Sequence, residues 1–190
     1  MEKNGLGGRD RYGREKRGSA LTRRTGACRA RFTDVDHDGS LDIEETIRLR
    51  YVFGPGAHSN PLARTVHRLE SGRWVADVGS MRTAPPPPAL LEAYVQQIRR
   101  RDWSATPPDE DGILITTATG RMWEIMVPLV YQGHAAAAIK VFQDAWPEEI
   151  PGADRNLAFF VERLRRATPF WTELMRIQDP PVDWTTILAD

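Results

Sequence analysis

The chain has 190 residues, of which 41% are hydrophobic and 27% charged, as in soluble globular proteins with an ordinary core. Its 26 Lys and Arg balance its 26 Asp and Glu, so net charge does not point to nucleic acid or an acidic membrane. Cys28 is the only cysteine, which excludes an internal disulfide and a thiolate metal cluster. No apolar run predicts a membrane span and no signal peptide is present. We therefore expect a soluble protein, cytoplasmic as written, whose compartment is otherwise unknown.

Residues 1–19 are rich in Gly and Arg and contain almost no apolar side chain, which predicts a disordered basic tail. The basic character continues to Arg31. Only Tyr12 and Phe32 supply aromatic rings beside it, whereas nucleic-acid binding favours interleaved aromatic side chains. We therefore do not expect a nucleic-acid partner.

Residues 20–56 form the next predicted unit. A weak apolar stripe over residues 20–32 predicts a short helix, and Ile43–Phe53 is predicted as a second helix that ends at Gly54-Pro55-Gly56. Between them lies the twelve-residue segment Asp34–Glu45, DVDHDGSLDIEE.

This segment places oxygen ligands at the spacing that calcium requires. Carboxylates stand at its first, third, fifth, ninth and twelfth positions, and the seventh would offer a backbone carbonyl. Gly39 at the sixth permits the sharp turn past the ion. The apolar residue at the eighth, Leu41, is expected to point into the core and His37 to point outward. The predicted ligands are Asp34, Asp36, Asp38, Ser40, Asp42 and Glu45.

The loop resembles that of the EF-hand calcium-binding family. The resemblance implies a helix–loop–helix and one bound Ca²⁺ ion, with Glu45 closing the site through both oxygens. Thr46 departs from the family, which usually has an apolar residue there. EF-hands also pair, and no second loop is present. An unpaired loop leaves open a weaker site, support from the rest of the chain, or a homodimer.

Residues 57–88 are predicted as a linker. Within it, Arg73–Met81 alternates apolar and polar side chains over part of its length and predicts a short strand. Pro85–Pro88 predicts a stiff spacer.

Residues 89–178 are predicted as an α-helical domain, followed by a tail at 179–190. The expected helices are Ala89–Asp102, Ile113–Gln132, Ala135–Trp146, Arg155–Ala167 and Pro169–Ile177. The stretch Tyr131–Pro147 resembles the centre of a tetratricopeptide repeat, with Gly133, Ala138, Phe142 and Ala145 at the matching positions. An ordinary helical hairpin explains the same pattern equally well. The predicted fold class is thus mainly α, with little β structure.

The sequence contains no catalytic motif, so we predict no catalytic residue and lean against an enzyme. The expected function is Ca²⁺ binding, with the helical domain contacting a protein or peptide partner. Its tryptophans fill the core or anchor that partner. The alternative is an enzyme in which calcium is only a structural staple, which predicts a cleft lined by titratable groups of the helical half.

Overall fold

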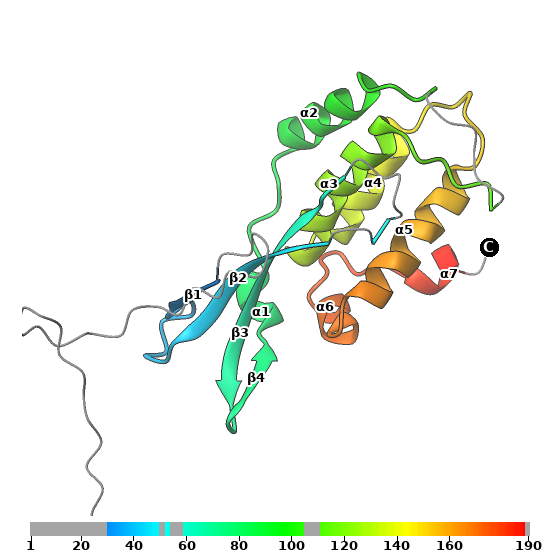
Figure 1. The fold of residues 1–190 in the computed structure, drawn as a ribbon. Coiled ribbons are helices and arrows are strands. Elements are labelled where there is room, and N and C mark those ends of the chain that lie inside the picture. Colours follow the sequence, from blue (N-terminus) through cyan, green and yellow to red (C-terminus); the bar gives the residue numbers. More distant parts are fainter. Residues whose placement is uncertain (1–29, 50–51, 54–58, 105–110, 189–190) are drawn as a thin grey trace, which may run out of the picture.

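The computed structural model describes residues 30–49, 52–53, 59–104 and 111–188. In the described part of the chain a four-stranded sheet comes first and seven helices follow it (Figure 1). The elements in chain order are β1 Ala30–Thr33, β2 Asp42–Arg48, β3 Leu62–Glu70, β4 Arg73–Ala76, α1 Val78–Met81, α2 Pro88–Arg99, α3 Thr117–Tyr131, α4 Ala135–Ala145, α5 Ala153–Ala167, α6 Trp171–Arg176 and α7 Trp184–Leu188. Within the described part of the chain, no helix is long and apolar enough to cross a membrane.

The fold class predicted from the sequence is wrong. The structure contains 46% helix and 17% strand, and the strands form one antiparallel sheet in the order β1-β2-β3-β4. The protein is therefore an α/β mixture in which the loop Asp34–Leu41 joins two strands instead of two helices.

The predicted helix Ile43–Phe53 is replaced by strand β2. Ile43 and Ile47 are four residues apart, and this spacing places two residues on the same face of either a helix or a strand. The intervening residues decide the outcome. Glu44, Thr46 and Arg48 alternate with the isoleucines, and the run is rich in β-branched side chains, which favours a strand.

The predicted linker contains most of the sheet. β3 and β4 form an antiparallel hairpin across Ser71-Gly72, and β4 occupies the start of the predicted strand Arg73–Met81. Helix α1 takes up the rest of that segment. The proline run is extended up to Pro87, and Pro88 is the first residue of α2, where a missing N–H costs nothing.

The sheet has one apolar face and one charged face, because paired residues share a face and successive residues alternate. The register Phe32↔Ile43 and Leu69↔Trp74 places apolar side chains on one face. At the outer end of this face the rings of Phe32 and Trp74 approach to 6.2 Å between centroids. The opposite face carries Arg31, Glu44, Arg64, Arg68 and Arg73.

The five predicted helices of the C-terminal half are present with shifted ends, and α7 forms within the predicted tail. Eleven of the fifteen residues of α3 are buried, so this helix is the centre of the core. Thr116 caps α3 by accepting from the backbone N–H groups of Ala118 and Thr119.

The sheet and the helices share one core. Phe53, which follows β2, stacks on Trp123 of α3 at 4.9 Å and on Phe160 of α5 at 5.5 Å between ring centroids. Ala63 and Val66 of β3 are buried in the same cluster. The hairpin of β1 and β2 projects away from this core, and its loop lies at the tip (Figure 1).

Candidate metal site

The loop between β1 and β2 is shaped by its own side chains. Each of four aspartates accepts a backbone N–H from within the loop. Asp34 accepts from Gly39 at 3.2 Å, Asp36 from Asp38 at 3.2 Å, Asp38 from Ser40 at 2.7 Å and Asp42 from Val35 at 3.0 Å. Short polar side chains bond to nearby backbone in this way when the chain turns tightly.

Two residues of the loop adopt a left-handed backbone conformation. Gly39 has φ 89°, as the sequence predicts for the position where the chain turns past an ion, and His37 has φ 63°. A Cβ at position 39 would meet no neighbouring atom, so backbone conformation, and not space, is the reason for glycine there. His37 is exposed, as expected.

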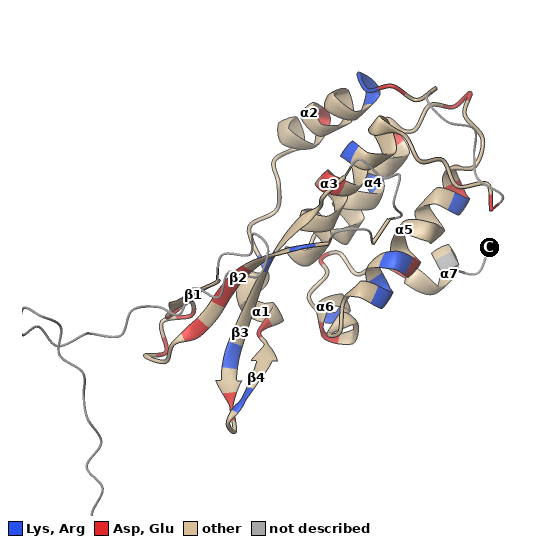
Figure 2. Ribbon diagram, in the orientation of Figure 1, with Lys and Arg blue, Asp and Glu red and all other residues tan. Residues whose placement is uncertain are grey.

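The loop brings three of the predicted ligands together. One carboxylate oxygen from each of Asp34, Asp36 and Asp42 lies within 4.8 Å of the other two. Among the described residues this is the only group of three or more such side chains close enough to hold a metal ion. The acidic residues at the hairpin tip stand out in Figure 2.

The three aspartates differ in their surroundings. Asp42 is 3% exposed, Asp34 is half-buried and Asp36 is exposed. Oδ1 of Asp34 is shielded from solvent and has no hydrogen-bond donor among the described residues. A carboxylate oxygen without water or donor is costly unless a cation compensates its charge.

The remaining predicted ligands lie outside this cluster. Asp38 and Ser40 are exposed in the loop. Glu45 lies within β2 on the apolar face of the sheet, where its Oε1 is 3.9 Å from Nδ1 of His67. Leu41, expected in the core, is 60% exposed. The strand explains the position of Glu45, because successive residues along a strand point to opposite faces and β2 leads away from the loop after Asp42.

Glu44, which sequence reasoning did not single out, anchors the base of the hairpin. Its carboxylate binds Arg64 of β3 at 2.6 Å and Arg31 of β1 at 2.5 Å. The hydrogen bond from Arg64 is the main cause that lowers the pKa of Glu44, and Arg31 adds to it. An alternating strand pattern would have placed Glu44 on the face opposite Ile43 and Glu45, but its two arginine partners depend on the strand register.

No protein-family model, curated protein or solved structure matches this chain. The atoms of the loop itself therefore indicate which ions it can bind. Its clustered donors are all carboxylate oxygens, which bind hard cations such as Ca²⁺ and Mg²⁺ in preference to zinc or copper.

Proposed function

We propose that the β1–β2 loop binds one Ca²⁺ ion through Asp34, Asp36 and Asp42, and that the helical part of the protein binds a protein partner. The observation that carries the calcium proposal is the cluster of three carboxylates with ligand oxygens within 4.8 Å of one another. Like charges this close repel, and a divalent cation converts that repulsion into attraction.

Two further features of the loop support the binding of a cation. The unpartnered Oδ1 of Asp34 supplies a ligand atom already removed from water. The outer side of the loop is exposed, so water molecules can complete the six to eight oxygens that Ca²⁺ takes. Mg²⁺ requires stricter octahedral geometry, which three carboxylates on a turning loop meet less readily.

The proposed ligand set is narrower than the EF-hand resemblance implies. Glu45 would close an EF-hand site, but here its carboxylate approaches His67 on a sheet face. We therefore assign no calcium contact to Glu45. A site that lacks this bidentate ligand binds more weakly than a complete one, because affinity rises with the number of charged ligands.

Thermal unfolding with and without Ca²⁺ tests the calcium proposal. A ligand that binds only the folded state raises its stability by about 2.7 kcal/mol at a hundred times Kd. We expect Ca²⁺ to raise the Tm of the chelator-treated protein, and the Asp34→Asn variant to lose the rise. Asp154→Asn, which changes an exposed aspartate of α5, is the matched control and should keep it. An unchanged Tm in the unsubstituted protein would overturn the proposal.

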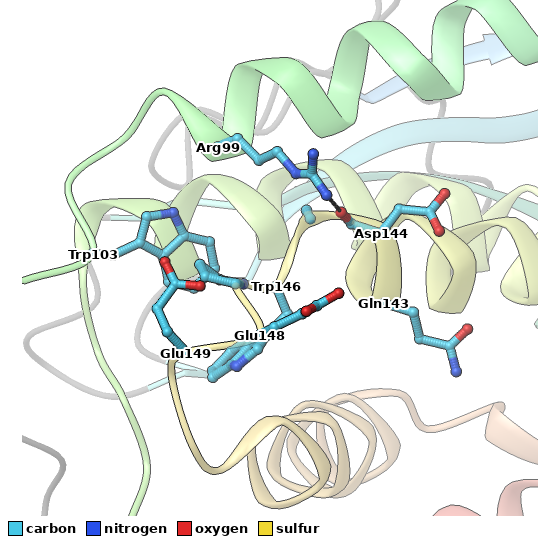
Figure 3. Close-up of a pocket in the computed structure, with 9 residues that line it drawn as sticks. Arg99, Trp103, Gln143, Asp144, Trp146, Glu148 and Glu149 are labelled. Carbon is cyan, nitrogen blue, oxygen red and sulfur yellow. Dashed lines mark hydrogen bonds between the residues drawn. The ribbon is translucent and has the colours of Figure 1, made fainter.

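The enzymatic alternative predicted a cleft lined by titratable groups. The helical part does contain a pocket lined in part by Asp144, Glu148 and Glu149, together with Arg99 (Figure 3). Its lining among the described residues includes no hydroxyl, thiol, amine or imidazole, and no hydrogen bond joins the carboxylates of those residues. We therefore propose no reaction for it. Its composition fits a binding role.

A further inference from the structure

The pocket of Figure 3 forms where two helices end. The last residue of α2, Arg99, reaches the last turn of α4, and its Nη2 donates to the backbone carbonyl of Asp144 at 2.5 Å. The side chains of Trp103 and Trp146 and the segment Pro147–Glu149 complete a cavity of about 610 Å³. The pocket belongs to the helical part of the protein and shares no residue with the calcium loop.

Its lining favours a cation. Three of the described residues that line it carry carboxylates, whereas Arg99 is the only basic one among them. Glu148 and Glu149 are exposed and form no ion pair within the described part of the chain, whereas the carboxylate of Asp144 binds Lys140 at 2.8 Å. Figure 3 shows both glutamates across the pocket from Arg99.

The helix end adds partial negative charge. Backbone carbonyls at the C-terminus of a helix attract cations, and Arg99 already uses one of them at the end of α4. This contact shows that a guanidinium fits here. Arg100 and Arg101 continue the chain after α2 but do not line the pocket.

Two indole rings provide an aromatic wall. Trp103 meets Trp146 edge to face, with centroids 5.2 Å apart and an interplanar angle of 76°. Trp146 is buried and its N–H donates to the carbonyl of Ile150, so its position is fixed. Trp103 is only half-buried, and its buried N–H has no acceptor among the described residues. A partly open indole attracts a cation to its face, and a buried donor without an acceptor favours a ligand that also brings a carbonyl, as a peptide backbone does.

A second hollow, of about 400 Å³, is lined by residues of α2 and α4. The two hollows share Arg99 and Asp144 in their linings, so they are adjacent, and together we call them the groove. Pro88, Leu91 and Val95 line the second part, which is more apolar. A groove with a charged end and an apolar length fits a peptide segment better than a free ion.

We propose that this groove binds a segment of a partner protein, and that the pocket of Figure 3, which Trp103 lines, receives an arginine side chain of that segment. A planar guanidinium stacks on indole and donates to several carboxylate oxygens at once, which an ammonium does less well. Apolar residues beside the arginine lie along Leu91 and Val95. The inference rests on the proposed protein-binding role of the helical part and is independent of calcium.

The test follows the indole N–H signals of the full chain by NMR during titration with defined peptides. The probe is an equimolar mixture of pentapeptides with arginine at the centre and uncharged residues elsewhere, and its control has citrulline at the centre. The Trp103 signal is assigned with a Trp103→Phe variant. We expect it to shift saturably with the arginine mixture and much less with the citrulline mixture.

A double variant, Glu148→Gln with Glu149→Gln, should bind the arginine mixture about tenfold more weakly, because the two charges that face the guanidinium are gone. Glu173→Gln, at an exposed glutamate of α6, is the matched control and should bind like the unsubstituted protein. No shift of Trp103, an equal shift with citrulline, or unchanged affinity in the double variant would overturn the inference. The Asp34→Asn variant should bind the arginine mixture as the unsubstituted protein does. A failure of peptide binding is therefore distinguishable from a failure of the calcium proposal.

Discussion

Glu44 joins three strands of the sheet through a single carboxylate. It lies on β2 and binds Arg31 of β1 and Arg64 of β3 on the charged face. Arg64 also donates to the carbonyl of Ser80 in α1 at 2.8 Å, so the same contact links the sheet to the first helix. This arrangement holds the base of the β1–β2 hairpin to the body of the protein.

Replacement of Glu44 should destabilise the protein in a pH-dependent way. Hydrogen bonding to Arg64 first, and to Arg31 second, lowers the pKa of Glu44 below its ordinary 4.5. A lowered folded-state pKa contributes stability above that ordinary value, and the contribution is lost as pH falls through the folded pKa. We expect Glu44→Gln to lower the free energy of unfolding by about 1–2 kcal/mol at pH 7. Below the pKa of Glu44 in the folded protein the substitution should change it little. Urea unfolding at a series of pH values measures this. A cost that does not fall with pH would contradict it.

The residues of the β1–β2 loop show which parts of the proposed site local sequence patterns could predict. Asp34, Asp36 and Gly39 could be predicted because a tight loop is governed by neighbours within a few positions. Glu45 could not be placed, because the direction of its side chain depends on whether the chain after the loop is helix or strand. A helix would return it toward the ion, whereas β2 turns it to the face that carries His67.

At the scale of elements, α2 to α6 were predictable, whereas α1, α7 and most of the sheet were not. The helices of the C-terminal half carry sustained apolar periodicity and clear breaks, such as Gly133 with φ 87° after α3. β3 mixes Arg64, His67 and Arg68 with its apolar residues, and its partner β2 is distant in sequence. Strand pairing of this kind is set by tertiary contacts, which local patterns do not report.

The side chain of Gln178 connects helices α3, α4 and α6, and the sequence patterns did not predict this contact. Its amide donates to the carbonyls of Val130 and Leu174, and its oxygen accepts from the N–H of Ala135 at 2.9 Å. It therefore ties the end of α6 to both sides of the turn between α3 and α4. Such a bridge satisfies helix-end groups that would otherwise be buried without partners.

Gln178→Ala should lower the free energy of unfolding by about 2–4 kcal/mol, because several buried backbone groups lose their partners. Chemical denaturation of purified protein measures the change. Gln96→Ala on the exposed face of α2 should stay within about 0.5 kcal/mol. Equal effects of the two substitutions would show that the bridge does not support the α3–α4 turn.

At the scale of the whole molecule, the sheet and the helices behave as one folding unit if their shared core determines stability. Phe53 lies between Trp123 and Phe160, and the rings of Phe53 and Phe160 are nearly parallel at 6°. The division into a calcium module and a helical domain stays a prediction from sequence, and cooperative unfolding is the property that tests it.

We expect tryptophan fluorescence and far-ultraviolet circular dichroism to report coincident unfolding transitions. Phe53→Leu should lower the stability seen by both methods equally, by about 1–3 kcal/mol, because the buried ring loses its stacked neighbours. Phe32→Leu, at an exposed position of β1, is the matched control and should have a much smaller effect. Two separate transitions, or a shift in only one method, would show that the parts unfold independently.

The most direct test of the calcium site is a calorimetric Ca²⁺ titration of the metal-free protein beside two variants, Asp42→Asn and Glu45→Gln. The hairpin geometry predicts one bound ion, an affinity about tenfold or more weaker in Asp42→Asn, and an affinity within about threefold of the unsubstituted protein in Glu45→Gln. A helix–loop–helix site would instead depend strongly on Glu45. Loss of binding in Glu45→Gln, or no heat of Ca²⁺ binding in the unsubstituted protein, would contradict the site proposed for this loop.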